Sequence, residues 1–403
     1  MRLRVPVVVV LVCLLAVGFA AAIAGCGGSG KDPSPTPAAP NPGTGKQQPA
    51  KASEQEAAAS LGFPGFATKN TTRVGGADAV ADAAAVALAV YPSASADSRP
   101  LAVALADVDD WHAAISAAQL MSPPLAAPVL LSQQGNLPAS SAQALAQLDP
   151  RGATKAGGAQ VLRIGAAAAA VDAKLKASTV TGADPAALAR AIDEIHSTAT
   201  GSPSSAVLVA PTDEAAFAMP AAGLAVKTGA PVLWTGKDRL PAPTAAAIRA
   251  RKKPRIYVIG PPSVVSDRVV KRLRRLGTVK RIAGKEPIAN AVAVARFGDG
   301  SFGWNVVDPG HGLVFASGER TADAAAAAAL SGAGAFGPLL LLSSPDSLPS
   351  VVQSYLLDIQ PGYDRDPVRG VYNHGWLMGD TSAISTAVQA RIDSLLEIQP
   401  VNR

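Results

Sequence analysis

The sequence contains few of the residues that usually build chemical sites. It has two cysteines, Cys13 and Cys26, four histidines, and only 4% aromatic residues. Two cysteines cannot supply a disulfide framework or a four-thiolate metal site. The chain is long enough for one large core or several small ones. We therefore expect its stability to come from buried aliphatic side chains.

Known catalytic patterns are missing as well. Gly75-Gly76 and Gly157-Gly158 have neither a phosphate-loop lysine nor a G-x-G-x-x-G frame, and no Gly-x-Ser-x-Gly elbow occurs. The histidines are scattered and form no metal-binding pair: His112, His196, His311 and His374. The sequence therefore predicts no enzyme and no cofactor.

The N-terminus reads as an export signal. Two arginines precede an apolar run from Val5 to Ala24, and the run ends Ile23-Ala24-Gly25-Cys26. This ending resembles the bacterial lipobox, which implies cleavage before Cys26 and attachment of diacylglycerol, with fatty acids such as palmitate, to its thiol. Residues 1–25 would then be a signal peptide, and the protein would be anchored to the outer face of the cell membrane.

An uncleaved membrane helix is the alternative, because about 20 apolar residues can span a bilayer. The run is followed at once by Gly27-Gly28-Ser29-Gly30, with no basic flank to stop transfer, which favours the lipobox. Residues 26–58 are rich in Gly, Pro, Ser, Lys and Gln. Such a segment cannot bury enough apolar surface to fold, so we expect a disordered linker that extends into the cell wall.

The remainder of the chain contains three copies of one unit. Each copy has an apolar strand, an acidic turn, an Ala-rich helix and a second strand preceded by proline; these prolines are Pro128, Pro231 and Pro338. A third apolar strand closes each unit, and an amphipathic helix follows it in the second and third units. The clearest such helix runs from Val264 to Leu276.

Short apolar strands that alternate with helices indicate an α/β fold with parallel sheets. We place the three repeat modules at residues 70–178, 179–280 and 281–397. Each is large enough to be a domain.

The repeats resemble the cell-wall-binding repeat 2 family of bacterial surface proteins. The most similar stretch is Ala316-Ser317-Gly318-Glu319-Arg320-Thr321-Ala322-Asp323-Ala324, followed by Gly337-Pro338-Leu339-Leu340-Leu341. The starts of the units also fit, as in Arg73-Val74-Gly75-Gly76-Ala77-Asp78. The resemblance implies three Toprim-like three-layer modules in a pseudo-threefold arrangement and non-covalent binding to anionic wall polymers.

The chain departs from this family at two places. The Arg-Tyr and Thr-Ala that follow the opening Gly-x-Asp in the family are missing in all three units, and the second unit has Ala210-Pro211-Thr212-Asp213 in place of the Ser-Gly turn. The resemblance therefore carries over the fold better than the ligand.

Positive charge is concentrated in one segment. From Arg249 to Lys285 the chain has thirteen Lys or Arg and one acid, Asp267, a net charge of +12, whereas the whole chain has +6. Such a segment attracts polyanions through a field that salt screens. The candidate ligand-binding residues are Arg249, Arg251, Lys252, Lys253, Arg255, Arg268, Lys271, Arg272, Arg274, Arg275, Lys280 and Arg281.

The expected partner is an anionic polymer or peptidoglycan-associated glycan of the wall, with anionic lipid heads as a further candidate; export disfavours nucleic acid. The plain alternative is a solvated basic helix face. Acids at strand ends, namely Asp107, Asp109, Asp110, Asp213 and Asp323, with His112 beside the first three, are expected to stabilise helix N-termini rather than to bind metal.

The leading hypothesis is thus a non-catalytic lipoprotein that binds the cell wall. A solute-binding lipoprotein of a transport system is the alternative, although that class needs two lobes around a cleft. A degenerate hydrolase is a third possibility, which the missing catalytic pattern disfavours.

Overall fold

The computed structural model describes residues 66–333 and 337–401. The expected signal peptide, the lipidation site at Cys26 and the linker at residues 26–58 lie outside the described residues. Within the described part, no helix combines the length and the apolar character that a membrane span requires.

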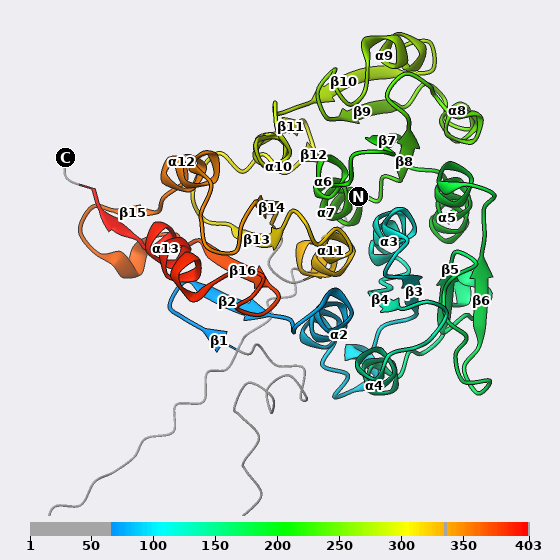
Figure 1. Cartoon of the computed structure of the whole chain (residues 1–403), viewed down its shortest axis with the longest axis horizontal. Helices are drawn as coiled ribbons and strands as arrows, with labels where there is room; N and C mark the ends of the chain where they lie inside the picture. Colours follow the sequence, from blue (N-terminus) through cyan, green and yellow to red (C-terminus); the bar gives the residue numbers. More distant parts are fainter. Residues whose placement is uncertain (1–65, 334–336, 402–403) are drawn as a thin grey trace, which may run out of the picture. The chain divides into compact units, whose positions relative to one another are not determined.

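Three sheets, each with four parallel strands, confirm the α/β prediction (Figure 1). In spatial order, the first contains β4 (Val129–Ser132), β3 (Val103–Asp107), β5 (Val161–Ile164) and β6 (Ala177–Val180). The second contains β10 (Thr278–Ile282), β9 (Arg255–Ile259), β7 (Ala206–Pro211) and β8 (Val232–Thr235). The third contains β2 (Thr71–Val74), β16 (His374–Met378), β13 (Gly312–Ser317) and β14 (Leu339–Leu342), with β1 (Phe66–Ala67) antiparallel to β2.

Helices connect these strands. They are α2 (Ala79–Val90), α3 (Trp111–Ala117), α4 (Ala139–Leu148), α5 (Pro185–Thr200), α6 (Ala215–Ala218), α7 (Pro220–Thr228), α8 (Ala242–Arg249), α9 (Asp267–Leu273), α10 (Pro287–Arg296), α11 (Asp323–Ala333), α12 (Ser350–Asp358) and α13 (Thr386–Leu396). Short 3₁₀ turns are η1 (Ala96–Ser98), η2 (Ala118–Met121), η3 (Thr154–Ala156) and η4 (Pro367–Arg369). Two small ribbons pair β11 (Gly298–Asp299) with β12 (Phe302–Gly303), and β15 (Gly362–Tyr363) with β17 (Gln399–Pro400).

The expectation that the third strand closes each unit is wrong. The third strands β5, β9 and β16 lie inside their sheets, each beside the first strand of its unit. The outer place is taken by a fourth strand: β6, β10 or β2. In the third sheet this strand comes from the other end of the described chain, because β2 pairs with β16.

The first two units begin with a Gly-x-Asp pattern, which follows from this fourth strand; the third unit has Gly284-Lys285-Glu286 instead. A helix begins directly after it, so the chain turns in very little space. A Cβ atom on Gly182 would lie 2.2 Å from the backbone nitrogen of Leu188. Asp78 and Asp184 are helix N-caps whose side chains accept from the backbone N–H three residues later, at 2.8 and 2.7 Å. The pattern is thus explained by local structure without a ligand.

Small side chains let the helices after the first strands approach closely. These are α3 with η2, α7, and α11, and they contact one another pairwise, as a pseudo-threefold arrangement predicts. At the contact of α7 with α11, a Cβ atom on Gly223 would lie 2.8 Å from Ser331 Oγ. The Ala-rich composition therefore allows close packing of these helices in the core.

Candidate functional site

The basic segment covers one face of the second sheet. The connections from β8 to β9 and from β9 to β10 run in the same direction along the sheet. Right-handed crossovers therefore place α8 and α9 on one face and α7, which connects β7 to β8, on the other. Figure 1 shows α8 and α9 away from the helices that meet at α7.

The predicted amphipathic character of this segment is confirmed. Val265, Val269 and Leu273 are fully buried, whereas the cations between and after them are exposed. Exposed basic side chains also follow α8. Because each helix runs antiparallel to the strands, the ends of α8 and α9 meet the same edge of the sheet. The exposed cations at this edge are Arg249, Lys252, Lys253, Lys271, Arg272, Arg274 and Arg275, here called the basic surface.

Arg251 does not belong to this surface, contrary to the expectation. Its side chain is only 3% exposed and forms two hydrogen bonds to the Asp193 carboxylate, at 2.6 and 2.7 Å. It also donates to the backbone oxygens of Ala247 and Ser204. A buried guanidinium with this many acceptors holds α5 against α8 and cannot reach a polymer.

Three other expected residues already have partners. Lys280 pairs with Asp299 at 2.8 Å, and Arg281 pairs with Asp267 at 3.1 Å. Arg255 lies over the ring of Phe302. The one remaining member of the predicted set is Arg268, which is exposed near the start of α9, at the opposite end of this helix from the basic surface. Apart from Arg268, the structure thus separates the predicted set into the basic surface and residues with partners inside the fold.

A Ser–His pair beside Asp193 resembles a hydrolase site. His196 Nε2 lies 2.7 Å from Ser122 Oγ, and both residues line a cavity of about 480 Å³. Burial lowers the pKa of His196, so its ring is neutral at pH 7. Gln119 Nε2 faces His196 Nδ1 at 3.3 Å and also donates to the Gly229 carbonyl at 3.1 Å.

The hydrogen bonds give this pair the wrong polarity for catalysis. Ser122 Oγ accepts from His196 Nε2 when its own hydrogen is directed at another acceptor. The Ser122 hydroxyl in turn donates to the Gln119 carbonyl at 2.7 Å. A serine nucleophile needs the reverse, with Nε2 as the acceptor. The pair is a buried structural contact.

The acids at the strand ends act in local structure. Asp110 caps α3 and accepts from the Ala113 N–H at 3.0 Å. Asp107 accepts from the Asp109 N–H, and His112 Nε2 lies 2.8 Å from the Thr212 carbonyl. Asp323 lies in the first turn of α11. No group of three or more potential metal ligands occurs among the described residues.

One buried charged cluster had no signal in the sequence. Asp82 and Asp323 are both 0% exposed, and the guanidinium of Arg320 pairs with both, at 3.0 Å from Asp323. Burial raises the pKa of Asp82 to about 9 and that of Asp323 to about 6. At neutral pH Asp82 therefore keeps a proton and remains uncharged.

The other two modules have different residues at the positions equivalent to Asp82 and Asp323. Val74, Ile282 and Val180 occupy equivalent register positions, and the residue eight places later is Asp82, Asn290 or Leu188. Val314, Leu208 and Ala104 are likewise equivalent, and nine places later come Asp323, Phe217 and Ala113. Asn290 makes the same bond as Asp82, accepting from Gly284 N–H as Asp82 accepts from Gly76 N–H. The fold therefore does not require the acidic pair.

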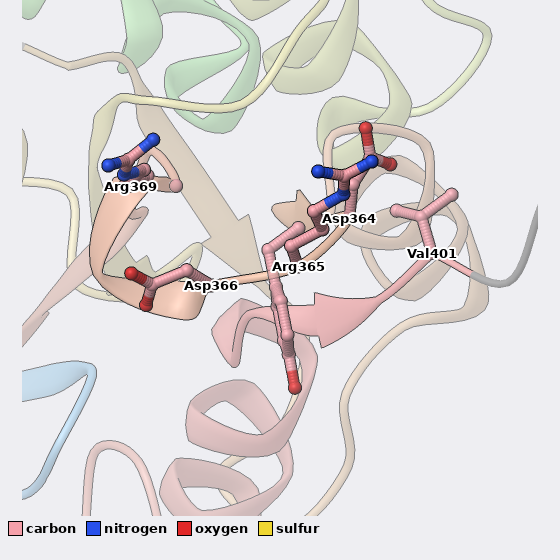
Figure 2. A pocket seen from close by; sticks show the side chains of 8 residues that line it. Asp364, Arg365, Asp366, Arg369 and Val401 are labelled. Carbon is pink, nitrogen blue, oxygen red and sulfur yellow. The ribbon is translucent and has the colours of Figure 1, made fainter.

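A further pocket lies in the third module, where the chain runs from α12 to β16 (Figure 2). It has a volume of about 890 Å³ and is open to solvent. Figure 2 shows Arg369 and Asp366 on one side and Asp364, Arg365 and Val401 on the other. Sequence reasoning missed this pocket because no motif marks the connection that builds it.

Comparison with known proteins supports a wall-binding fold. Residues 179–270 and 281–389 match the family described as Cell wall binding domain 2 (CWB2). No curated protein sequence matches the chain. Among solved structures, Cwp6 from Clostridium difficile is similar with a TM-score of 0.66 and 16% identity, over 81% of this chain and 48% of that one. Cwp8 from Clostridium difficile is similar with a TM-score of 0.60 and 16% identity, over 82% of this chain and 53% of that one.

These structural similarities establish the fold only. They cover more of the chain than the two matched stretches, and the chain spans about half the length of each of these structures. The family match is to binding domains alone and includes no catalytic domain.

Proposed function

We propose that this protein is a lipid-anchored surface protein that binds an anionic wall polymer non-covalently through the basic surface. The match of residues 179–270 and 281–389 to the CWB2 family supports this proposal. The lipid anchor is Cys26, and the segment at residues 26–58 lets the domains extend from the membrane into the wall. The protein thus connects membrane and wall without catalysing a reaction.

The observation that carries this proposal is the group of seven exposed cations at one edge of the second sheet. In the segment Arg249–Lys285 the only acid is Asp267, and it is engaged by Arg281. Arginine can hold a phosphate or carboxylate through two parallel hydrogen bonds, and lysine adds point charge. A plain solvated helix face would need no such concentration at the ends of two helices.

The positions of these cations also fit helix electrostatics. Lys271 and Arg272 lie in the last turn of α9, and Arg249 ends α8, where positive charge interacts favourably with the helix dipole. The helix dipole contributes little to stability, and one or two cations at each helix end are enough for this interaction. The remaining charges are therefore available to a ligand.

The test uses residues 51–403, whose described part, residues 66–333 and 337–401, lies within one compact unit. This protein is sedimented with purified cell walls of the source organism, before and after anionic polymers are removed, across a salt series. We expect binding to intact walls that weakens steeply with salt, because each neutralised anion releases a counterion. Equal binding to intact and stripped walls at all salt concentrations would refute the polyanion as the ligand.

A further inference from the structure

The connection from α12 to β16 is an insertion that the sheet does not need. It comprises residues 359–373 and is longer than the equivalent connections, residues 149–160 and 250–254. It has its own small structure: β15 pairs with β17, and η4 follows. Long connections with internal structure in compact domains usually carry function.

The insertion is held in place rather than loose. Asn373 connects its end to two neighbouring segments, because its Oδ1 accepts from Gly310 N–H and His311 N–H while its Nδ2 donates to the Ile359 carbonyl. The Tyr372 hydroxyl donates to the Pro367 carbonyl. A preorganised loop loses little entropy when it binds a ligand.

Exposed apolar side chains gather around this insertion. Among the described residues, six large apolar side chains are exposed, and Val368 is the most exposed, at 81%. Val371 and Tyr372 lie in the insertion, Leu357 lies just before it, Val401 lies beside β15, and Val307 precedes the segment bound by Asn373. Val401 lines the pocket itself, and the other five place exposed apolar surface on or next to the same connection, as is typical of a binding site.

The pocket is lined by both hydrogen-bond donors and hydrogen-bond acceptors. Arg365 and Arg369 are pure hydrogen-bond donors, and Asp366 is an acceptor. The two arginines are matched in charge by Asp364 and Asp366, so the pocket offers a polyanion no net positive charge. A sugar ring matches the set, because each hydroxyl both donates and accepts while the C–H face packs on apolar groups such as Tyr363 and Val401.

We propose that this pocket, here called the insertion pocket, binds a hydroxyl-rich glycan chain of the cell wall. The inference rests on the proposed wall-binding function but concerns a second ligand. The basic surface would hold the charged polymer, and the insertion pocket would hold an uncharged sugar segment. Two weak sites on one chain would raise the overall avidity for the wall.

The test measures binding of residues 51–403 to walls from which anionic polymers have been removed, and to tetra-N-acetylchitotetraose by calorimetry. The double variant Tyr363→Ala, Arg365→Ala is compared with Arg391→Ala, which removes an exposed arginine on α13. We expect the double variant to lose at least about tenfold in affinity for stripped walls, the size of a lost hydrogen-bonded contact, and Arg391→Ala to lose none. Thermal melting checks that both variants are folded.

The outcomes separate this inference from the proposed function. Salt-dependent binding to intact walls that survives in the double variant, together with lost binding to stripped walls, supports two ligands. If the folded double variant binds stripped walls as well as the unaltered protein does, the insertion pocket is not a glycan site. If stripped walls are not bound at all, the inference also fails, whereas the polyanion proposal stands.

Discussion

Asp82 in α2 and Asp323 in α11 are paired with the same guanidinium, that of Arg320, although neither carboxyl group is exposed to solvent. The pair joins α2, the helix after strand β2, to α11, the helix after strand β13. β2 itself completes the third sheet beside β16. The cluster therefore lies where the two ends of the described chain are connected.

This cluster makes stability depend on pH. The pKa of Asp82 rises from 3.8 in the unfolded chain to about 9, so the folded state binds more protons than the unfolded state between these values. The free energy of unfolding should therefore fall as pH rises from about 4 to about 9. Asp323, with a pKa of about 6, adds to this fall in its lower part.

Asp82→Asn should remove the fall in the free energy of unfolding at the upper end of this pH range. Asparagine mimics the protonated carboxyl, and Asn290 already occupies the equivalent position in the second module. We expect the variant to be more stable than the unaltered protein at pH 9 and similar at pH 5, as measured by urea unfolding. An unchanged slope between pH 6 and pH 9 would show that Asp82 is already ionised in the folded protein.

Arg251 and Arg272 lie in the same basic segment but should differ in their contribution to stability. Arg251→Met leaves the buried carboxylate of Asp193 without its partner and should lower the free energy of unfolding by about 3 kcal/mol or more. The exposed Arg272→Gln should change stability by less than about 0.5 kcal/mol. Denaturant unfolding measures both. If the two variants were equally stable, the interpretation of Arg251 as a structural residue would be wrong.

Arg73 should hold the N-terminal strand in the third sheet. Its guanidinium is buried and donates to the backbone oxygens of Gly379, Asp380 and Ile384 and to Gln389 Oε1. Arg73→Met should cost about 2–4 kcal/mol, because these buried acceptors lose their donors. In this variant the backbone amides of β16 should lose protection against hydrogen exchange. The amides of the first sheet should keep their protection and serve as the internal control.

Cys26→Ser should abolish lipid attachment. Cells that express the full chain are labelled with a palmitate analogue, and the labelled protein is recovered from membranes. We expect no label on Cys26→Ser and normal label on Cys13→Ser, because only Cys26 follows the lipobox. Label on both variants, or on neither the variants nor the unaltered chain, would contradict anchoring through Cys26.

Local patterns in the sequence predicted much of the fold. Pro128, Pro231 and Pro338 mark the repeats because each stands before a buried strand, and the spacing of Val265, Val269 and Leu273 predicted the buried face of α9. Both signals depend on residues near one another in the chain. They are therefore visible without knowledge of the tertiary structure.

Contacts between distant segments could not be predicted in this way. Within a basic run Arg251 resembles its neighbours, and only its pairing with Asp193 in α5 makes it structural. Asp82 lies in the Ala-rich helix α2, and its partner Arg320 is more than 200 residues away in the sequence. The place of β2 beside β16 is equally non-local. These features depend on the packing of the modules, for which one sequence carries no pattern.

The most direct test of the account compares two charge-matched variants in wall binding. One replaces Lys271, Arg272, Arg274 and Arg275 by Gln; the other replaces four exposed cations elsewhere, Arg151, Lys174, Lys237 and Arg391, by Gln. The account predicts that the first variant loses at least about tenfold in affinity for intact walls at low salt and has a shallower salt dependence, while the second changes little. Equal losses in both variants would show that net charge alone, and not the basic surface, holds the protein to the wall.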